Sequence, residues 1–209
     1  MSNTIVSPVF QKFLDEPKQL SAIDCAVKLG INVNWLLAVI YFETAKTFSP
    51  SKANHIGSVG LIQFTRDKAG VNYKTINGKQ YALSYLAGLS FEKQMLVVHD
   101  YLAEQIRIAG KTPQRFIDLY LLVFFPKAVN QSSDFVLQTK SLTASLIASQ
   151  NKIFDINKDS KIQKKEIETF FNSYFTKNGF NFSKDVDQRK KLSWVFLAVF
   201  FYSVLSLTI

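Results

Sequence analysis

The sequence predicts a mainly α-helical fold with one small β-hairpin, followed by a helix–loop–helix extension and a C-terminal hydrophobic helix. Three observations support this prediction. Apolar runs with helical spacing are bounded by capping residues, the 209-residue chain has only 8 Gly and 5 Pro, and Asn77-Gly78 lies between two short β-compatible runs. Scarce Gly and Pro argue against a turn-rich all-β protein. The 47% of hydrophobic residues exclude disorder for the chain as a whole.

The main body is expected to extend through residues 1–148 as one helical domain. Its expected helices are residues 22–29 closed by Gly30, residues 35–42 capped by Asn34, residues 91–109 between Ser90 and Gly110, and a helix that Thr112-Pro113 opens and Pro126 ends. Residues 149–183 are expected to form the helix–loop–helix extension, and residues 184–209 a basic flank and the hydrophobic helix.

The charge of the chain indicates a polyanionic partner. With 25 basic and 16 acidic residues the net charge is +9, which suits nucleic acid, a membrane surface or the bacterial wall. The basic residues are 21 Lys and only 4 Arg. Because bidentate reading of bases prefers Arg, no nucleic-acid partner is expected. One cysteine excludes an internal disulfide framework and a cysteine-rich zinc site.

The end of the chain is uncharged from Leu192 to Ile209, a run of 18 residues. As a helix this run would be roughly 27 Å long, close to the thickness of a bilayer core. Arg189-Lys190-Lys191 precedes it, as basic residues often flank a membrane span. The run is therefore expected to enter a membrane or contact a hydrophobic partner, with a buried helix of a soluble assembly as the alternative. The N-terminus lacks the charged and apolar segments of a signal peptide.

Glu43 directly follows the strongly apolar run of residues 35–42. A carboxyl group at that position is expected to be partly desolvated, and desolvation raises its pKa. A general acid that protonates a leaving oxygen near neutral pH needs this shift. By itself, however, the position favours an ordinary surface glutamate near a helix end.

Two segments around Glu43 resemble the lysozyme-like lytic transglycosylase superfamily, which includes goose-type lysozymes, and in particular its phage-type branch. Residues 42–50, FETAKTFSP, stand for the segment that ends the catalytic helix of that family. Residues 57–63, GSVGLIQ, stand for the segment that opens the next helix and lines the sugar cleft, with Ser58 in place of Ala and Ile62 in place of Met. The resemblance implies a lysozyme-like helical domain and cleavage of the β-1,4 bond between N-acetylmuramic acid and N-acetylglucosamine in peptidoglycan.

The resemblance also implies the roles of individual residues. The expected catalytic residue is Glu43, and the expected substrate-binding residues are Asn54, Ser58, Gly60, Gln63 and Phe125. The family often has Ser where this chain has Asn54, and many members have Tyr in the region of Phe125. No organic cofactor is expected.

Two mechanisms are open for such an enzyme. In the lytic transglycosylase route, one glutamate acts as acid and then as base, a group of the sugar completes the reaction, and an anhydro-sugar end is left. In the second route Asp67, the nearest downstream carboxylate, positions a water molecule for inverting hydrolysis. Asp67 is alternatively a solvated residue with no part in the reaction.

Residues 155–166, DINKDSKIQKKE, match the twelve-residue EF-hand loop. The expected calcium ligands are the side chains of Asp155, Asn157, Asp159 and Glu166 and the backbone carbonyl of Lys161. Ser160 replaces the glycine at which this loop normally turns, and it would strain the turn. Calcium is expected to serve a structural role, and a metal-free helix–turn–helix is the alternative. A single loop of this kind after the body also occurs in the phage-type branch.

The expected place of action is the bacterial wall or periplasm. An enzyme carried by a phage tail or injection apparatus would reach the wall without a signal peptide, and residues 192–209 would then contact the particle or the target membrane. The competing functional class is a catalytically weak or inactive, calcium-stabilised and membrane-associated protein that binds peptidoglycan on a degenerate lysozyme fold.

Overall fold

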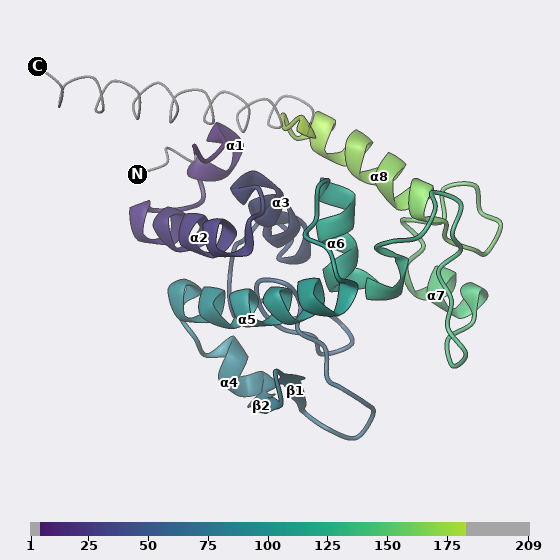
Figure 1. Cartoon of the computed structure of the whole chain (residues 1–209), viewed down its shortest axis with the longest axis horizontal. Coiled ribbons are helices and arrows are strands. Elements are labelled where there is room, and N and C mark those ends of the chain that lie inside the picture. Colours follow the sequence, from purple (N-terminus) through teal and green to yellow (C-terminus); the bar gives the residue numbers. More distant parts are fainter. Residues whose placement is uncertain (1–4, 183–209) are drawn as a thin grey trace, which may run out of the picture.

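The computed structural model of the chain describes residues 5–182 (Figure 1). The basic flank and the hydrophobic run of residues 192–209 lie outside the described residues, so the membrane prediction for that run stays a prediction. Within the described part, no single helix has both the length and the apolar composition needed to cross a membrane; α2 and α3 satisfy both criteria only as a pair, which bends by 118°.

Residues 5–182 form eight α-helices, a short 3-10 helix and one two-stranded antiparallel sheet, which confirms the mainly α prediction with one small hairpin. The elements in order are α1 (Pro8–Gln11), α2 (Glu16–Leu29), α3 (Val33–Glu43), β1 (Tyr73–Ile76), β2 (Lys79–Ala82), α4 (Leu83–Ala87), α5 (Phe91–Ala109), α6 (Phe116–Phe124), η1 (Pro126–Ala128), α7 (Ala144–Gln150) and α8 (Lys164–Lys177).

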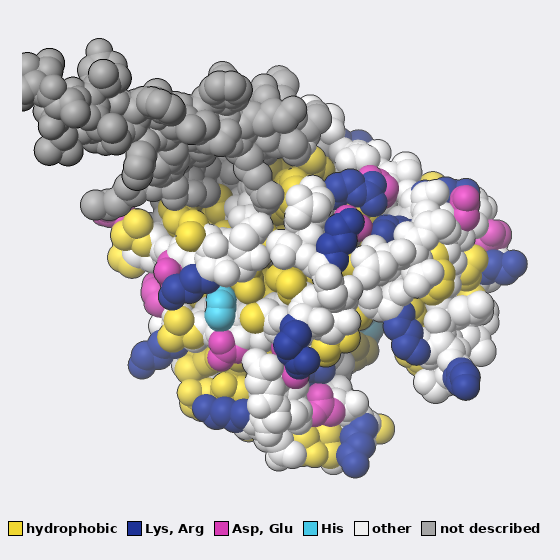
Figure 2. Space-filling view, in the orientation of Figure 1, with side chains coloured by type: hydrophobic (Ala, Val, Ile, Leu, Met, Phe, Trp, Pro, Cys, Tyr) yellow, Lys and Arg dark blue, Asp and Glu magenta, His cyan; other side chains and the backbone are white. Residues whose placement is uncertain are grey.

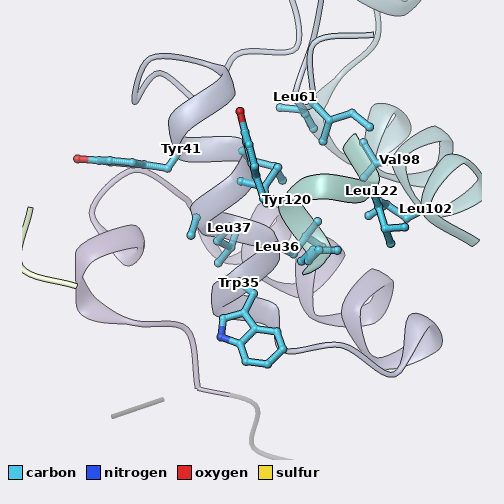
Figure 3. Close-up of a cluster of buried hydrophobic side chains, with 14 of the residues drawn as sticks. Trp35, Leu36, Leu37, Tyr41, Leu61, Val98, Leu102, Tyr120 and Leu122 are labelled. Atoms are coloured by element: carbon cyan, nitrogen blue, oxygen red, sulfur yellow. The ribbon is translucent and has the colours of Figure 1, made fainter. Parts of the chain in front are cut away.

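The long helix α5 is the support of the main body. It packs along α2 and also contacts α6 and β1. In Figure 1, α3 and α6 lie on one side of α5, and α4 with the hairpin lies on the other. Residues 33–41 of α3 are all buried, so this helix is the centre of the core. Figure 3 shows Tyr120 of α6 beside α3, with Leu122 facing Val98 and Leu102 of α5.

Several boundaries follow the predicted caps. Gly30 closes α2 and Gly110 closes α5, both with a left-handed backbone, and the Ser90 hydroxyl accepts a hydrogen bond from the Lys93 amide at the start of α5. The hairpin turns at Asn77 and Gly78, which have φ of 48° and 77°. Two consecutive positive φ values give the turn twist that suits a two-residue hairpin loop.

The expected start of the helix that Gly30 closes is too late, because α2 begins at Glu16 and not at residue 22. Two further predicted starts, those of α3 and α6, are also wrong.

Asn34 is not a cap, because α3 begins at Val33 and the side chain of Asn32 accepts from the amide of residue 34. The Asn34 side chain is instead buried, where it accepts from the Ser7 amide at 2.7 Å and donates to the Ile5 carbonyl at 3.0 Å. This asparagine therefore ties the N-terminal segment to α3.

The third wrong start is that of α6. Thr112-Pro113 does not open this helix, which begins at Phe116 after an extended Arg115 with φ −137° and ψ 156°. The extended Arg115 directs its guanidinium group to Asp118 at 3.5 Å and to Glu168 of α8 at 3.2 Å. The extended Arg115 thus contacts α8, and α6 starts later than the local sequence predicts.

The residues after position 148 share the core of the main body. Buried Phe154, Ile162, Phe171 and Phe175 belong to the same hydrophobic cluster as α3 and α6. The domain boundary at residue 148 stays a prediction, but no separate core accompanies it within the described residues.

A buried lysine fixes the start of α8 against α6. Lys164 is 3% exposed, and its ammonium group lies 3.1 Å from an Asp118 carboxylate oxygen. The same group donates to the Val129 carbonyl at 2.8 Å and to the Gln131 carbonyl at 3.3 Å. Because a buried charge is costly unless it is paired and hydrogen-bonded, these partners select one position for α8.

Candidate active site

Glu43 is the last residue of α3, and the chain turns sharply behind it. The Thr44 hydroxyl donates to the Ile40 carbonyl at 2.6 Å and accepts from the Phe48 amide at 2.9 Å, which fixes the turn. Ala45, Lys46 and Phe48 all have positive φ, between 50° and 72°. Such backbone is unfavourable for residues with a side chain, and it persists where surrounding contacts impose it.

The carboxyl group of Glu43 is held away from water. The residue as a whole is half-buried, but its carboxyl group is enclosed by protein, and this burial raises its pKa from 4.5 to about 8. A hydrogen bond with the side chain of Tyr120 acts in the opposite direction and limits the rise. Glu43 is therefore mostly protonated at neutral pH, as a general acid requires.

Tyr120, in the second turn of α6, is not among the site residues that the sequence predicts. Its side chain is buried, and burial together with the nearby Glu43 charge raises its pKa well above the ordinary value. The hydroxyl group therefore keeps its proton and remains a donor to Glu43. The family resemblance predicts a tyrosine in the region of Phe125, whereas the hydroxyl group next to Glu43 belongs to Tyr120, five positions earlier.

Phe125 itself does not line a described cavity near Glu43. It ends α6 with an extended backbone (φ −153°) and packs, half-buried, against the core. Its neighbour Phe124 lines the cavity beside Gln63 and stacks on Tyr120 with ring centroids 5.6 Å apart. The aromatic residues that line this cavity are thus Phe64, Tyr101 and Phe124, and Tyr120 lies behind Phe124.

Residues 57–63 form a tight loop and do not open a helix. Val59 makes isolated antiparallel bridges to Ala53 and Phe64, and the Gln63 amide donates to the Gly60 carbonyl at 3.1 Å. The expected helix start is therefore wrong. Gln63, the last residue of this loop, has a left-handed backbone conformation with φ 53°.

Position 60 must be glycine because the side chain of Gln94, from α5, lies against it. Gly60 has φ +89°, and a Cβ atom on it would lie 2.5 Å from Oε1 of Gln94. That oxygen accepts from the Leu61 amide at 2.6 Å, while the Gln94 side-chain nitrogen donates to the carbonyls of Leu86 and Pro50. The fully buried Gln94 thus fixes the loop to α5 and explains the glycine by packing within the protein.

Asn54 and Ser58 also hold the loop together. The Asn54 side-chain oxygen accepts from the amides of Ile56 and Ser58 at 3.1 and 3.0 Å. The Ser58 side chain is buried, and its hydroxyl is 2.8 Å from the Thr65 hydroxyl. Asn54 remains exposed and can still meet a ligand, whereas the Ser58 hydroxyl is enclosed.

Gln63 lines a cavity of about 390 Å³ between the loop, β1, α5 and the end of α6. Its side-chain nitrogen donates to the carbonyls of Lys52 and Gly60 at 3.0 and 2.9 Å. Its side-chain oxygen is buried and has no hydrogen-bond partner in the described part of the chain. A buried acceptor without a partner is costly, so a donor on a bound ligand would stabilise it.

The rest of this cavity combines aromatic and polar walls, which is the surface that sugars need. The lining residues are Ile62, Gln63, Phe64, Thr65, Lys74, Tyr101, Gln105, Val123, Phe124 and Pro126. Figure 2 shows that the surface is also hollowed between the part of the molecule with the hairpin and the part with α7, and that Lys and Arg side chains are spread over this face.

Asp67 connects the loop to the hairpin. Burial acts to raise the pKa of its carboxyl group, but hydrogen bonds from Thr75 and Lys74 outweigh burial and hold the pKa below the ordinary value. The Thr75 amide donates to it at 2.9 Å and the Lys74 ammonium group lies at 3.2 Å. Asp67 therefore fixes Lys74, which lines the cavity, and does not line the cavity itself.

The EF-hand-like loop is closed by its own expected ligands. Asp155 and Asn157 both accept from the Asp159 amide, at 3.1 and 3.0 Å, and Asp159 accepts from the Lys161 amide at 2.9 Å. Buried Glu166 accepts from the amides of residues 157 and 163. The side-chain oxygens that would hold calcium thus accept from backbone amides of their own loop.

Ser160 has the left-handed backbone that its position demands, with φ 64°. Among the described residues, no group of three His, Cys, Asp or Glu side chains is close enough to hold a metal ion. The donor set nevertheless suits calcium, which takes amide and backbone oxygens as well as carboxylates.

No protein-family model, curated protein or solved structure matches the chain. The resemblance to the lytic transglycosylases therefore rests on the two segments around Glu43 and Gln63.

Replacing Tyr120 with Phe is expected to raise the pKa of Glu43 above about 8, because the hydrogen bond that stabilises the carboxylate is lost. The measurement is a carbon-13 NMR titration of the Glu43 carboxyl group. Tyr101→Phe is the matched control, since its buried hydroxyl donates to the Leu122 carbonyl of α6 instead. An unchanged or lowered pKa in Tyr120→Phe would contradict the assigned contact.

Gly60→Ala is expected to destabilise the protein by about 2–4 kcal/mol, because left-handed strain adds to the collision with Gln94. Gly70→Ala is the matched control: its φ is +81°, but open space surrounds the added Cβ, so only about 1 kcal/mol of strain is expected. Urea unfolding measures both. Equal losses in the two variants would show that the contact with Gln94 contributes nothing.

Proposed function

We propose that this protein cleaves the β-1,4 bond between N-acetylmuramic acid and N-acetylglucosamine in peptidoglycan as a lysozyme-like lytic transglycosylase. The observation that supports this most directly is Glu43, a desolvated carboxyl group with a pKa of about 8 that is held by Tyr120. Gln63 supports it further, since this residue lines a cavity with aromatic walls and its buried side-chain oxygen lacks a partner within the described residues.

Glu43 acts first as acid. Its proton passes to the glycosidic oxygen as the bond between that oxygen and C1 breaks, which leaves Glu43 as a carboxylate. The 6-hydroxyl oxygen of the same muramic acid then forms a bond to C1, and its proton returns to Glu43. Water is not consumed, and the product has an anhydro end. The Tyr120 hydroxyl stabilises the intermediate carboxylate by donating to it.

The position of Asp67 favours this single-carboxylate route over inverting hydrolysis. Its oxygens already accept from the Thr75 amide and contact the Lys74 ammonium group. A base that activates water needs free access to the opposite face of the sugar. Hydrolysis with Asp67 remains the second mechanism, and mass spectrometry separates the two by anhydro or reducing product ends.

Glu43→Gln is expected to lower the release of soluble fragments from purified sacculi by at least about a hundredfold, because the proton donor is lost. In the unmodified protein, the rate is expected to fall as the pH rises through about 8, where the carboxyl group of Glu43 loses its proton. Retained cleavage by Glu43→Gln would overturn the assignment.

The same variant carries its own folding control. Between the unfolded pKa of 4.5 and the folded value of about 8, the native state keeps a proton that the unfolded state has released. The stabilisation from this group is therefore complete below pH 4.5 and is lost as the pH rises to 8. Because Gln stays neutral, Glu43→Gln is expected to be more stable than the unmodified protein at pH 8, by about 2–4 kcal/mol.

A second candidate is a protein that binds peptidoglycan without cutting it. The hydrogen bonds of Asn54 and Ser58 favour this second function. Both residues are predicted to contact sugar, but the Asn54 side-chain oxygen and the Ser58 hydroxyl group already have hydrogen-bond partners within the protein. Binding of glycan fragments without turnover by the unmodified protein would support it.

We also propose calcium as a structural ligand of residues 155–166, held by the side chains of Asp155, Asn157, Asp159 and Glu166 and by the Lys161 carbonyl. Calcium there supplies charge neutralisation and no chemistry to the reaction. Peptidoglycan is the proposed partner, in the wall or periplasm. Residues 192–209, outside the described part, are proposed to attach the protein to a membrane or to a phage-tail or injection particle.

Calcium is expected to stabilise the unmodified protein against unfolding, by about 2.7 kcal/mol when its concentration is a hundred times the dissociation constant. Thermal unfolding with calcium and with a chelator measures this. Asp155→Ala is expected to remove the effect, while Asp24→Ala, an exposed carboxylate of α2 paired with Lys28, should keep it. An equal response of the unmodified protein and Asp155→Ala would exclude this site.

A further inference from the structure

Helix α8 holds the residue that precedes Glu43. The ring of Phe42 lies edge-on to Phe171 with centroids 4.8 Å apart, and it also contacts Tyr174 at 5.4 Å and Phe170 at 5.8 Å. Edge-to-face pairs of this kind add about 0.5–1.5 kcal/mol each beyond burial and fix the relative orientation of the rings. The aromatic face of α8 thus determines the position of the last turn of α3.

The end of α8 also holds the turn that follows Glu43. The side-chain oxygen of Asn178 accepts from the Lys46 ammonium group at 2.9 Å and from the Tyr41 hydroxyl at 3.2 Å. The Asn178 side-chain nitrogen donates to the Tyr174 carbonyl at 2.7 Å, which fixes the orientation of the amide. Lys46 has φ 72°, so this contact restrains a residue whose backbone is otherwise unfavourable.

The hydrogen-bond partner of Glu43 rests on the same helix. The ring of Tyr120 contacts Phe171 at 4.4 Å and Phe154, the residue before the EF-hand-like loop, at 6.0 Å. Residues on both sides of Glu43 and the donor to its carboxyl group therefore all pack against the C-terminal segment.

We propose that α8 is part of the catalytic apparatus: by holding Phe42 and Lys46 on either side of Glu43, it positions the catalytic carboxyl group. Asn178 is the positioning residue that closes the turn, and it acts through Lys46 and Tyr41 without touching the substrate. The inference rests on the proposed function for its effect on catalysis, but its effect on the carboxyl group can be measured without any substrate.

The test compares Asn178→Ala with Asn172→Ala, a matched change at an exposed asparagine on the same helix. The readout is a carbon-13 NMR titration of the Glu43 carboxyl group. The titratable groups near this end of α3 are Tyr120 from α6, Tyr174 from α8, and Tyr41 and Lys46 from α3 and its turn. Loosening the turn admits water to the carboxyl group, so Asn178→Ala is expected to lower the midpoint by about one pH unit. Asn172→Ala should leave it unchanged.

Lys46→Met removes the same contact from the exposed side, where a change does not threaten the core. It is expected to lower the midpoint in the same direction as Asn178→Ala does. The double variant should show no larger shift than Asn178→Ala alone, because the contact that Lys46→Met removes is already lost in Asn178→Ala. Additive shifts, or an unchanged midpoint in Asn178→Ala, would overturn the proposal. If Asn178→Ala fails to fold, Lys46→Met decides: an unchanged midpoint refutes the proposal.

Turnover of sacculi supplies the second readout. In Asn178→Ala, kcat is expected to fall about tenfold while KM stays near its original value, since a misplaced acid affects the reaction and not binding. If the unmodified protein does not cleave peptidoglycan at all, the proposed function fails, while the NMR titration still tests whether α8 positions Glu43.

Discussion

The complete burial of α3 is the constraint on which the other features of this molecule depend. All residues from 33 to 41 are buried, so α3 must be covered on every side, and the helices that contact it are α1, α2, α6 and α8. A helix of this kind has no polar face through which to approach water. Glu43, the first carboxylate that the helix reaches, therefore emerges into a desolvated environment, and its raised pKa is a consequence of the packing.

Aromatic rings provide most of the cover at this end of α3. The chain has 19 Phe and 8 Tyr, and many of those from α3, α6 and α8 contact one another in a single cluster. Flat rings fill the space between helices in a few edge-to-face or stacked orientations, which restrict the positions of the helices more strongly than aliphatic side chains do. The residues after position 148 contribute Phe154, Phe171 and Phe175 to this cluster and are thus required to complete the core.

Features encoded by local contacts could be predicted from the sequence. Helix α5 has the predicted bounds, because Ser90 and Gly110 act on their own neighbouring amides and carbonyls. The hairpin turn at Asn77-Gly78 depends only on two residues that tolerate positive φ. The position of Glu43 after an apolar helix likewise predicts a desolvated carboxyl group, whatever packs around it.

Features that depend on distant partners could not be predicted in this way. Tyr120 meets Glu43 across 77 positions of sequence, and only the crossing of α3 and α6 brings them together. The contact between Gln94 and the loop also joins residues far apart in the sequence. It is the reason why position 60 must be glycine, because a Cβ atom there would collide with the Gln94 side chain. The sequence does indicate that Gln94 and Tyr120 need partners, because Gln94 lies among apolar residues of α5 and Tyr120 among those of α6. Polar groups at such positions must form hydrogen bonds when the helices pack.

The loop of residues 57–63 shows how the same contacts can serve stability and a binding site. Asn54, Ser58 and Gln94 satisfy the polar groups of the loop with partners inside the protein, which makes its backbone rigid. Gln63 differs, because both donors of its amide are used while its buried oxygen has no partner among the described residues. An acceptor fixed in place by its own donors is preorganised, so a ligand that supplies a donor pays no cost to orient it. A rigid loop that lines a cavity and holds one unsatisfied acceptor is therefore a structure suited to a ligand that is rich in hydroxyl and amide donors.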